Sequence, residues 1–122
     1  MDLIPLTSTG DITEGSAKEF NLPQYDPPLE IFIVHHQQRY FAYLNRCPHT
    51  GVNLNWLPDQ FFDIEHEFIQ CATHGALFKV DNGYCVRGPC AGAALQPVCI
   101  VIQGDTIYFN TTGTDAITSS SN

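Results

Sequence analysis

The sequence predicts an all-β fold, built as an antiparallel sandwich or small barrel. No stretch of about a dozen residues places apolar side chains at the helical spacing of i, i+3, i+4 and i+7, and eight prolines interrupt the candidate segments. Short runs rich in β-branched and aromatic residues recur instead, with turn-forming residues roughly every eight to twelve positions. These three features are typical of compact all-β domains.

The first half of the chain contains three expected strands. Residues 18–22 form the first, after the turn-rich segment 11–15. Residues 29–36 and 39–45 are β-rich runs separated by the short polar pair Gln37-Gln38, which predicts a hairpin. No internal repeat is present.

The second half of the chain continues the same pattern. The expected strands are residues 68–71, 77–80, 84–86, 96–103 and 106–110. Asp81-Asn82-Gly83 is a strong hairpin signal, because Asn and Gly accept the positive φ angles of tight turns. Gly104-Asp105 predicts a second tight turn between the last two strands.

The length and the net charge of the chain limit the classes of protein to which it can belong. At 122 residues the chain is long enough for one domain, expected over residues 1–110, and the Ser/Thr-rich tail 111–122 is expected to be frayed. A net charge of −8 argues against nucleic acid as a partner, because phosphates require Lys and Arg. The acidity either suits a basic docking face on a partner or simply keeps the protein soluble.

Membrane insertion and secretion are not expected. No apolar run approaches the roughly 18 residues that a membrane helix needs. The N-terminus has neither a basic segment nor a long apolar segment, so no secretory signal is expected either. The expected location is therefore the cytoplasm.

Two cysteine–histidine pairs are the most informative motifs. Cys47-Pro48-His49 and Cys71-Ala72-Thr73-His74-Gly75 each offer one thiolate and one imidazole, and twenty-one residues separate them. A metal centre that takes one Cys and one His from each of two loops has two sulfur and two nitrogen ligands. Two classes of site use that ligand set: the Rieske [2Fe–2S] cluster and structural zinc.

The spacing favours the cluster over zinc. Zinc-finger sequences usually group Cys with Cys and His with His, at spacings of about two to five residues. This chain alternates Cys and His, and its first pair has only one intervening residue. A zinc-stapled binding module stays open as an alternative.

The chain resembles the Rieske [2Fe–2S] proteins. The resemblance rests on C-P-H-T-G, on C-x2-H-G followed by Phe78, and on the later Gly83 and Gly88-Pro89. It covers about residues 18–110 and is sharpest over residues 47–90. It implies an antiparallel β-sandwich or barrel with a cluster-binding subdomain formed by two hairpin loops. One [2Fe–2S] cluster per chain would lie at its tip, ligated by Cys47, His49, Cys71 and His74.

Within this family the chain is more similar to the low-potential ferredoxins of ring-hydroxylating dioxygenases. Relatives of the cytochrome bc type carry an additional Cys in each cluster loop, whereas this chain has Val52 and Thr73 there. Those relatives also place Ser and Tyr hydroxyls near the cluster, where this chain has Ala76 and Phe78. Fewer donors imply a reduction potential near the low end of the Rieske range, about −150 mV.

The resemblance implies a one-electron carrier rather than an enzyme. Its donor would be a flavin-containing reductase, and its acceptor an oxygenase or similar redox enzyme. The oxygenase subunit itself would need a second domain with a mononuclear iron. The alternative is a small redox or structural subunit of a larger oxidoreductase, similar to the small subunit of nitrite reductases.

The remaining cysteines and histidines are expected to be structural. Cys99 lies in an apolar run and is predicted to be a buried small hydrophobic residue. Cys85 and Cys90 are close enough in sequence to pair, although a cytoplasmic setting favours free thiols. The remaining histidines, which have no Cys at ligand spacing, are read as strand or loop residues: His35, His36 and His66.

Overall fold

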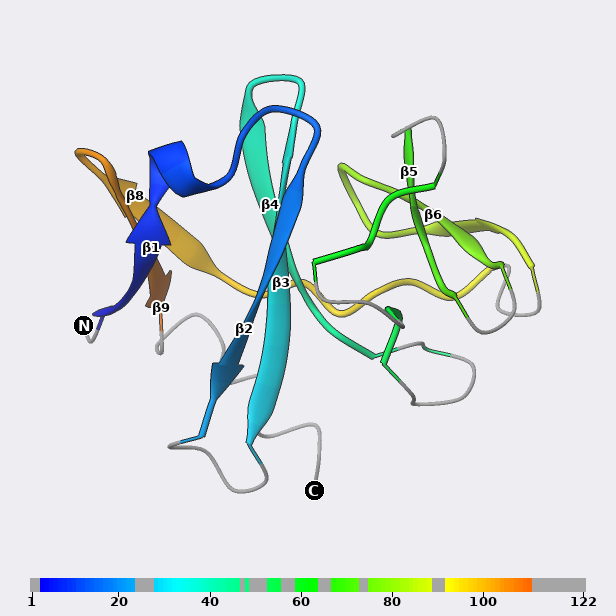
Figure 1. Ribbon diagram of the computed structural model, residues 1–122. Helices are drawn as coiled ribbons and strands as arrows, with labels where there is room; N and C mark the ends of the chain where they lie inside the picture. The colour runs from blue at the N-terminus through cyan, green and yellow to red at the C-terminus, as the bar shows by residue number, and fades with distance from the viewer. Residues whose placement is uncertain are drawn as a thin grey trace.

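The all-β prediction is confirmed. The computed structural model describes residues 3–23, 28–46, 48, 53–55, 59–63, 67–72, 75–88 and 92–110. Within these ranges the chain forms nine β-strands in three antiparallel sheets of three strands each, with one short 3-10 turn. Figure 1 shows one sheet in the centre and one on each side of it.

The central sheet contains β2 (Ala17–Leu22), β3 (Leu29–His36) and β4 (Arg39–Leu44), in that order. The sequence predicted all three strands, with bounds that agree to within one residue. β3 pairs with both neighbours along its length, from Leu22↔Leu29 on one side to His36↔Arg39 on the other. This sheet is therefore the centre of the fold, and the other two sheets pack against it.

The second sheet brings the two ends of the described chain together. It has the order β1-β9-β8, with β1 at Leu3–Ser8, β8 at Ile100–Gln103 and β9 at Thr106–Asn110. β1 was not predicted. It contains Pro5, beside which its register with β9 is irregular, and proline is a poor signal for a strand. Its pairing partner lies about a hundred residues away in the sequence.

The third sheet carries the second ligand motif. It consists of β5 (Phe68–Gln70), β6 (Leu77–Lys79) and β7 (Cys85–Arg87), in that order. The strand predicted at residues 84–86 lies one residue later, and Tyr84 instead makes an isolated bridge with Ala94.

The strand predicted at residues 96–103 begins only at Ile100. The residues before it run along the edge of β4, where Val98 N donates to Ala42 O at 2.9 Å. Tyr43 and Pro97 form an isolated bridge in the same place. This segment therefore covers β4 before it enters the second sheet as β8.

β3 is buried on both faces. Ile31 and Ile33 belong to the core cluster that includes Ile107 and Phe109 of the second sheet. Phe32 and Val34 alternate with them and belong to the core cluster of the third sheet. All four β3 residues have zero exposure. A continuous apolar run is what a strand covered by two layers requires, because its neighbouring side chains point to opposite faces.

The hairpin between β3 and β4 is stabilised by a distant carboxylate. Gln37 and Gln38 both have positive φ, 53° and 65°, which costs energy for residues other than glycine. Their backbone amides donate to Glu14 Oε2 at 2.7 Å and Oε1 at 2.8 Å. The hydrogen bond from Gln38 is the main cause that lowers the pKa of Glu14 below 4.5.

We expect Glu14→Gln to lower the free energy of unfolding at pH 7. Because the folded state lowers the Glu14 pKa, the stabilisation is fully present above pH 4.5 and is lost as pH falls through the lowered value. The wild-type and variant curves should therefore converge in acid. Urea unfolding between pH 3 and pH 7 measures this difference.

The matched control is Asp105→Asn, at a turn carboxylate whose side chain makes no hydrogen bond to a described residue. It removes the same charge without removing a cap. If the control loses as much stability at pH 7 as Glu14→Gln does, net charge rather than the turn is responsible.

Candidate metal centre

The first ligand loop is held at its base by a buried asparagine. Asn45 follows β4 and has 5% exposure. Its Oδ1 accepts from Leu54 N at 2.8 Å, and its Nδ2 donates to Asn55 Oδ1 at 2.9 Å. Asn45 thus joins the outgoing and returning limbs of the segment that contains Cys47 and His49, both of which lie outside the described residues.

A carboxylate on the edge of the central sheet anchors the returning limb. Glu19 of β2 accepts from Asn55 Nδ2 at 2.5 Å and from Asp59 N at 3.2 Å. Glu19 N in turn donates to Asp59 Oδ1 at 2.8 Å. These bonds also satisfy the edge of β2 that β3 does not use. The loop is therefore fastened to the central sheet on both sides.

The connection from the first loop to β5 is packed into the core. Phe61 stacks on Phe32 of β3, with ring centroids 4.2 Å apart and planes 6° from parallel. Its carbonyl oxygen accepts from Gln70 N at 2.8 Å, and Phe62 forms a bridge with Ile69. This packing sets the position of β5, at whose end the second ligand motif begins.

The second ligand loop is a tight turn around Cys71. Cys71 has zero exposure, and its backbone N donates to Ala76 O at 2.9 Å. Gly75 N donates back to Cys71 O at 2.8 Å, with φ of 71° at Gly75. That positive φ suits glycine. The turn brings Gly75, which directly follows His74, close to Cys71; His74 itself lies outside the described part of the chain.

One backbone hydrogen bond joins the two loops. Ala72 N donates to Leu54 O at 2.7 Å. Leu54 therefore uses its N–H for Asn45 of the first loop and its C=O for Ala72 of the second. The returning limb of the first loop and the start of the second loop, far apart in sequence, are therefore bonded to each other.

A third segment closes against the second loop. Gly88 has φ of 108°, and a Cβ built there would lie 2.7 Å from Ala76 Cα and 2.9 Å from Ala76 Cβ. Only glycine allows the backbone to approach this closely. Gly88-Pro89 is part of the resemblance to the Rieske proteins; the structure places its glycine against the second loop, while Pro89 lies outside the described residues.

Tyr43 joins the central sheet to the sheet that carries Cys71. Its hydroxyl donates to Val80 O at 2.6 Å, and burial raises its pKa to about 12. The phenol therefore stays protonated, as the donor of this hydrogen bond, at any ordinary pH. Gly83 packs against the same ring, since a Cβ there would lie 2.9 Å from Tyr43 Cε1.

Cys71, the one predicted ligand that the structure describes, lies in an apolar environment. Cys71, Ala76 and Phe78 belong to one buried cluster, with exposures of 0%, 1% and 0%. Ala76 and Phe78 are the positions where the sequence predicted that hydroxyl donors are missing. Both side chains are fully buried in the same cluster as Cys71, as that prediction requires.

These observations test whether the residues suit an iron–sulfur cluster. The described residues contain no group of three or more metal-binding side chains, and three of the four predicted ligands lie outside them. Within the described part, a buried thiol, two tied loops and a glycine that admits a third backbone fit a centre enclosed by loops. A set of two thiolates and two imidazoles suits iron–sulfur chemistry.

The other histidines that the structure describes have structural contacts, as predicted. His35 Nδ1 donates to Ile12 O at 2.8 Å, and its ring stacks on Tyr40 with centroids 4.1 Å apart. His36 packs near Phe62, with centroids 6.3 Å apart. Both lie at the hairpin end of β3. His66 lies outside the described residues.

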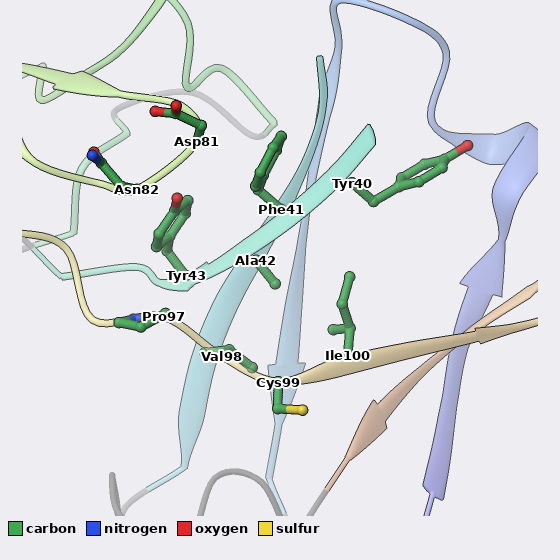
Figure 2. Close-up of a pocket in the computed structure, with 10 residues that line it drawn as sticks. All are labelled: Tyr40, Phe41, Ala42, Tyr43, Asp81, Asn82, Pro97, Val98, Cys99 and Ile100. Carbon is green, nitrogen blue, oxygen red and sulfur yellow. The ribbon is translucent and has the colours of Figure 1, made fainter. Parts of the chain in front are cut away.

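Cys99 differs from its prediction. It is half-buried rather than buried, and it precedes β8 beside a groove of about 480 Å³. The groove lies between β4 and residues 97–100, as Figure 2 shows, and its walls include Phe41 and Tyr43. The prediction failed because β8 starts one residue after Cys99.

Cys85 is buried, its thiol donates to Arg87 O at 3.2 Å, and Cys90 lies outside the described residues.

Within the described ranges, no helix is long and apolar enough to cross a membrane.

Comparison with known families identifies the class. The Rieske [2Fe-2S] domain family matches residues 2–103. The match covers most of the chain, so the chain belongs to the Rieske [2Fe–2S] domain family. Its cofactor is therefore the Rieske-type [2Fe–2S] cluster, a one-electron redox centre, as the sequence predicted. No curated protein matches the chain.

Solved structures support the same fold. The ferredoxin of carbazole 1,9a-dioxygenase from Nocardioides aromaticivorans IC177 has a TM-score of 0.70 and 20% identity, over 89% of this chain and 97% of that chain. The terminal oxygenase of carbazole 1,9a-dioxygenase from Novosphingobium sp. KA1 has a TM-score of 0.71 and 20% identity, over 88% of this chain and 29% of that one.

A third similar structure is the complex of reduced oxygenase and oxidised ferredoxin in carbazole 1,9a-dioxygenase. One of its chains has a TM-score of 0.69 and 17% identity, over 88% of this chain and 91% of that chain. At these identities the likeness shows the fold. This chain spans nearly the whole of the ferredoxin but under a third of the oxygenase chain.

We expect Gly88→Ala to destabilise the protein by about 2–6 kcal/mol. A positive φ costs about 1–3 kcal/mol for a residue other than glycine, and the contact of the new Cβ with Ala76 adds a similar cost. Urea unfolding measures the change.

Gly92→Ala is the matched control for Gly88→Ala. Gly92 has φ of 97°, but a Cβ there meets nothing within 4 Å, so only the backbone strain applies. The difference between the two variants isolates the contact with Ala76. Equal destabilisation would contradict a close approach of the third segment to the second loop.

Proposed function

We propose that this chain is a one-electron carrier protein that receives electrons from a flavin-containing reductase and passes them to an oxygenase. The observation that carries the proposal is the pair of tied loops, in which Ala72 N bonds Leu54 O beside a buried Cys71. Nearly full coverage of a ferredoxin, against a small part of an oxygenase chain, favours a separate carrier over a catalytic subunit.

The proposed ligands are Cys47, His49, Cys71 and His74. The bound cluster supplies reversible one-electron chemistry, and replacement of two thiolates by imidazoles raises its potential above that of all-cysteine clusters. Cys71 supplies a thiolate from an apolar, water-excluded position, and its loop is held by Ala76 and Gly75. The remaining described contacts orient the loops for this ligand set.

The partners and boundaries follow from the same proposal. The named relatives are components of carbazole 1,9a-dioxygenase, and one of them is a complex of oxygenase with ferredoxin. We place this chain in the cytoplasm, where reduced cysteines stay available as ligands. We treat residues 1–110 as one domain, since the last described strand ends at Asn110, and residues 111–122 as a tail outside it.

The test of the proposal is the metal content and its dependence on the four ligands. We expect two irons and two acid-labile sulfides per chain. Cys47→Ser and His74→Ala should each abolish stoichiometric iron and lower stability, because metal binding free energy adds to folding free energy. Metal analysis and visible absorption provide the measurement.

Cys99→Ala is the control for these ligand variants. It removes a half-buried thiol that precedes β8 and should retain full iron. Zinc in place of iron would support the zinc-stapled module instead. A metal-free but folded wild type would support a redox-inactive subunit. Iron that survives both ligand substitutions would disprove the ligand assignment.

We expect Ala76→Ser and Phe78→Tyr each to raise the reduction potential from a wild-type value well below zero. Both positions are buried in the same part of the hydrophobic core as Cys71, so little solvent competes with an added hydroxyl for hydrogen bonds. A hydrogen bond to a charged acceptor contributes roughly 1.5–3 kcal/mol, which for one electron is an upper bound of about 65–130 mV.

Protein-film voltammetry on the wild type and the two variants measures these shifts. Ala76→Val is the matched control, since it enlarges the same side chain without adding a donor. A wild-type potential near +300 mV, or equal shifts in the serine and valine variants, would contradict the role assigned to the missing hydroxyls.

A further inference from the structure

The sequence segments that hold the ligand motifs carry positive charge, unlike the protein as a whole. The chain has 13 carboxylates and only five Lys or Arg residues. None of those carboxylates lies in residues 40–58, 68–78 or 82–104, the three segments that hold the proposed ligands and the covering loop. The charged residues in these segments are two arginines, Arg46 and Arg87.

Both arginines lie beside the ligand loops. Arg46 directly precedes Cys47 and follows Asn45, whose side chain binds the returning limb of the same loop at Leu54. Arg87 pairs with Leu77 across the third sheet. The next residue, Gly88, packs on Ala76, the hydrogen-bond partner of Cys71.

The two guanidinium groups are available to a partner. Arg46 and Arg87 are exposed, and neither forms an ion pair with a described carboxylate. Among the described residues, the carboxylates at the first loop are Glu19 and Glu30 on the central sheet and Asp59 in the returning limb, whose Oδ1 accepts from Glu19 N. Glu19 accepts from Asn55, and Glu30 accepts from Asn53 Nδ2 at 3.3 Å once the amide oxygen and nitrogen of Asn53 are exchanged to match their partners. Glu19 and Glu30 are therefore engaged with the returning limb of the loop.

Exposed apolar side chains adjoin Arg87. Tyr84 and Val86 are each 45% exposed, and they are two of the three large hydrophobic residues that the described part of the chain exposes. Tyr, Arg and apolar residues at the centre, with few carboxylates, are typical of protein interfaces. We define the arginine rim as Arg46, Tyr84, Val86 and Arg87.

We propose that the redox partner docks on the arginine rim through a surface rich in carboxylates. The inference rests on the proposed function and deepens it, since it specifies the chemistry of the partner's docking face. The net charge of −8 suggests the opposite, a basic docking face. At physiological ionic strength charges interact over about 8 Å, so the local arginines act on a docked partner more strongly than distant carboxylates do.

The test measures the local field with two small oxidants of opposite charge. The full chain, shown to contain its iron, is reduced and mixed in a stopped-flow instrument with hexacyanoferrate(III) or hexaammineruthenium(III). In each reaction one electron leaves the reduced cluster and reduces the oxidant's Fe(III) to Fe(II) or Ru(III) to Ru(II), without proton transfer. The rate constants are compared at about 0.1 M ionic strength, where the Debye length is about 10 Å.

Arg46→Gln and Arg87→Gln should each slow oxidation by hexacyanoferrate about threefold and accelerate oxidation by hexaammineruthenium by a similar factor. This is the effect expected for a triply charged ion about 8 Å from the lost charge. Arg46→Lys and Arg87→Lys keep the charge and should retain the wild-type rates, which separates charge from packing.

Arg39→Gln is the matched control. Arg39 begins β4 and Arg46 follows its end, so the same exposed charge is removed about 23 Å away along one strand. The change that Arg39→Gln causes in the logarithm of either rate constant should be about a tenth, or less, of the change caused by Arg46→Gln. Equal effects at Arg39 and Arg46, or no effect at either arginine of the rim, would overturn the arginine rim. A wild type without iron would overturn the proposed function as well.

Discussion

The burial of β3 on both faces is the constraint on which the rest of the structure depends. Ile31 and Ile33 pack toward the second sheet, while Phe32 and Val34 pack toward the sheet that carries Cys71. A strand in this position needs a continuous apolar run and a layer on each side. The two ends of the chain supply one layer, and the ligand-bearing segments supply the other, so the core positions the redox site.

Leu54 connects the ligand loops to this packed core through hydrogen bonds. Its backbone receives a hydrogen bond from Ala72 and donates one to Asn45, whose side chain is buried at the end of β4. A buried amide or carbonyl left without a partner is costly, so each of these bonds restricts where the loops can lie. Backbone and side-chain hydrogen bonds among Asn45, Leu54 and Ala72 therefore join the described ends of the two loops.

The same scaffold separates charge along the molecule. Glu14 stabilises the β3–β4 turn, and Glu19 anchors the returning limb of the first loop. Glu14 acts at the opposite end of β4 from Arg46, whereas Glu19 lies beside the first loop, with its carboxylate bound by the Asn55 amide and the Asp59 N–H. An acidic protein can therefore present a cationic surface at its redox end. Net charge, a property of composition, does not determine the sign of the field that a docking partner meets, because salt screens distant charges.

The sequence by itself determined the fold class, the cofactor and most strands. Leu29–His36 and Thr106–Asn110 agree with the structure to the residue, because local β-patterning bounded by clear turns suffices there. The tertiary structure decided what depends on long-range contacts. β1 exists because β9 pairs with it, and the segment before Ile100 lies along β4, which leaves Cys99 half-buried. The contact of Gly88 with Ala76 and the bond from Ala72 to Leu54 likewise join residues that no local pattern connects.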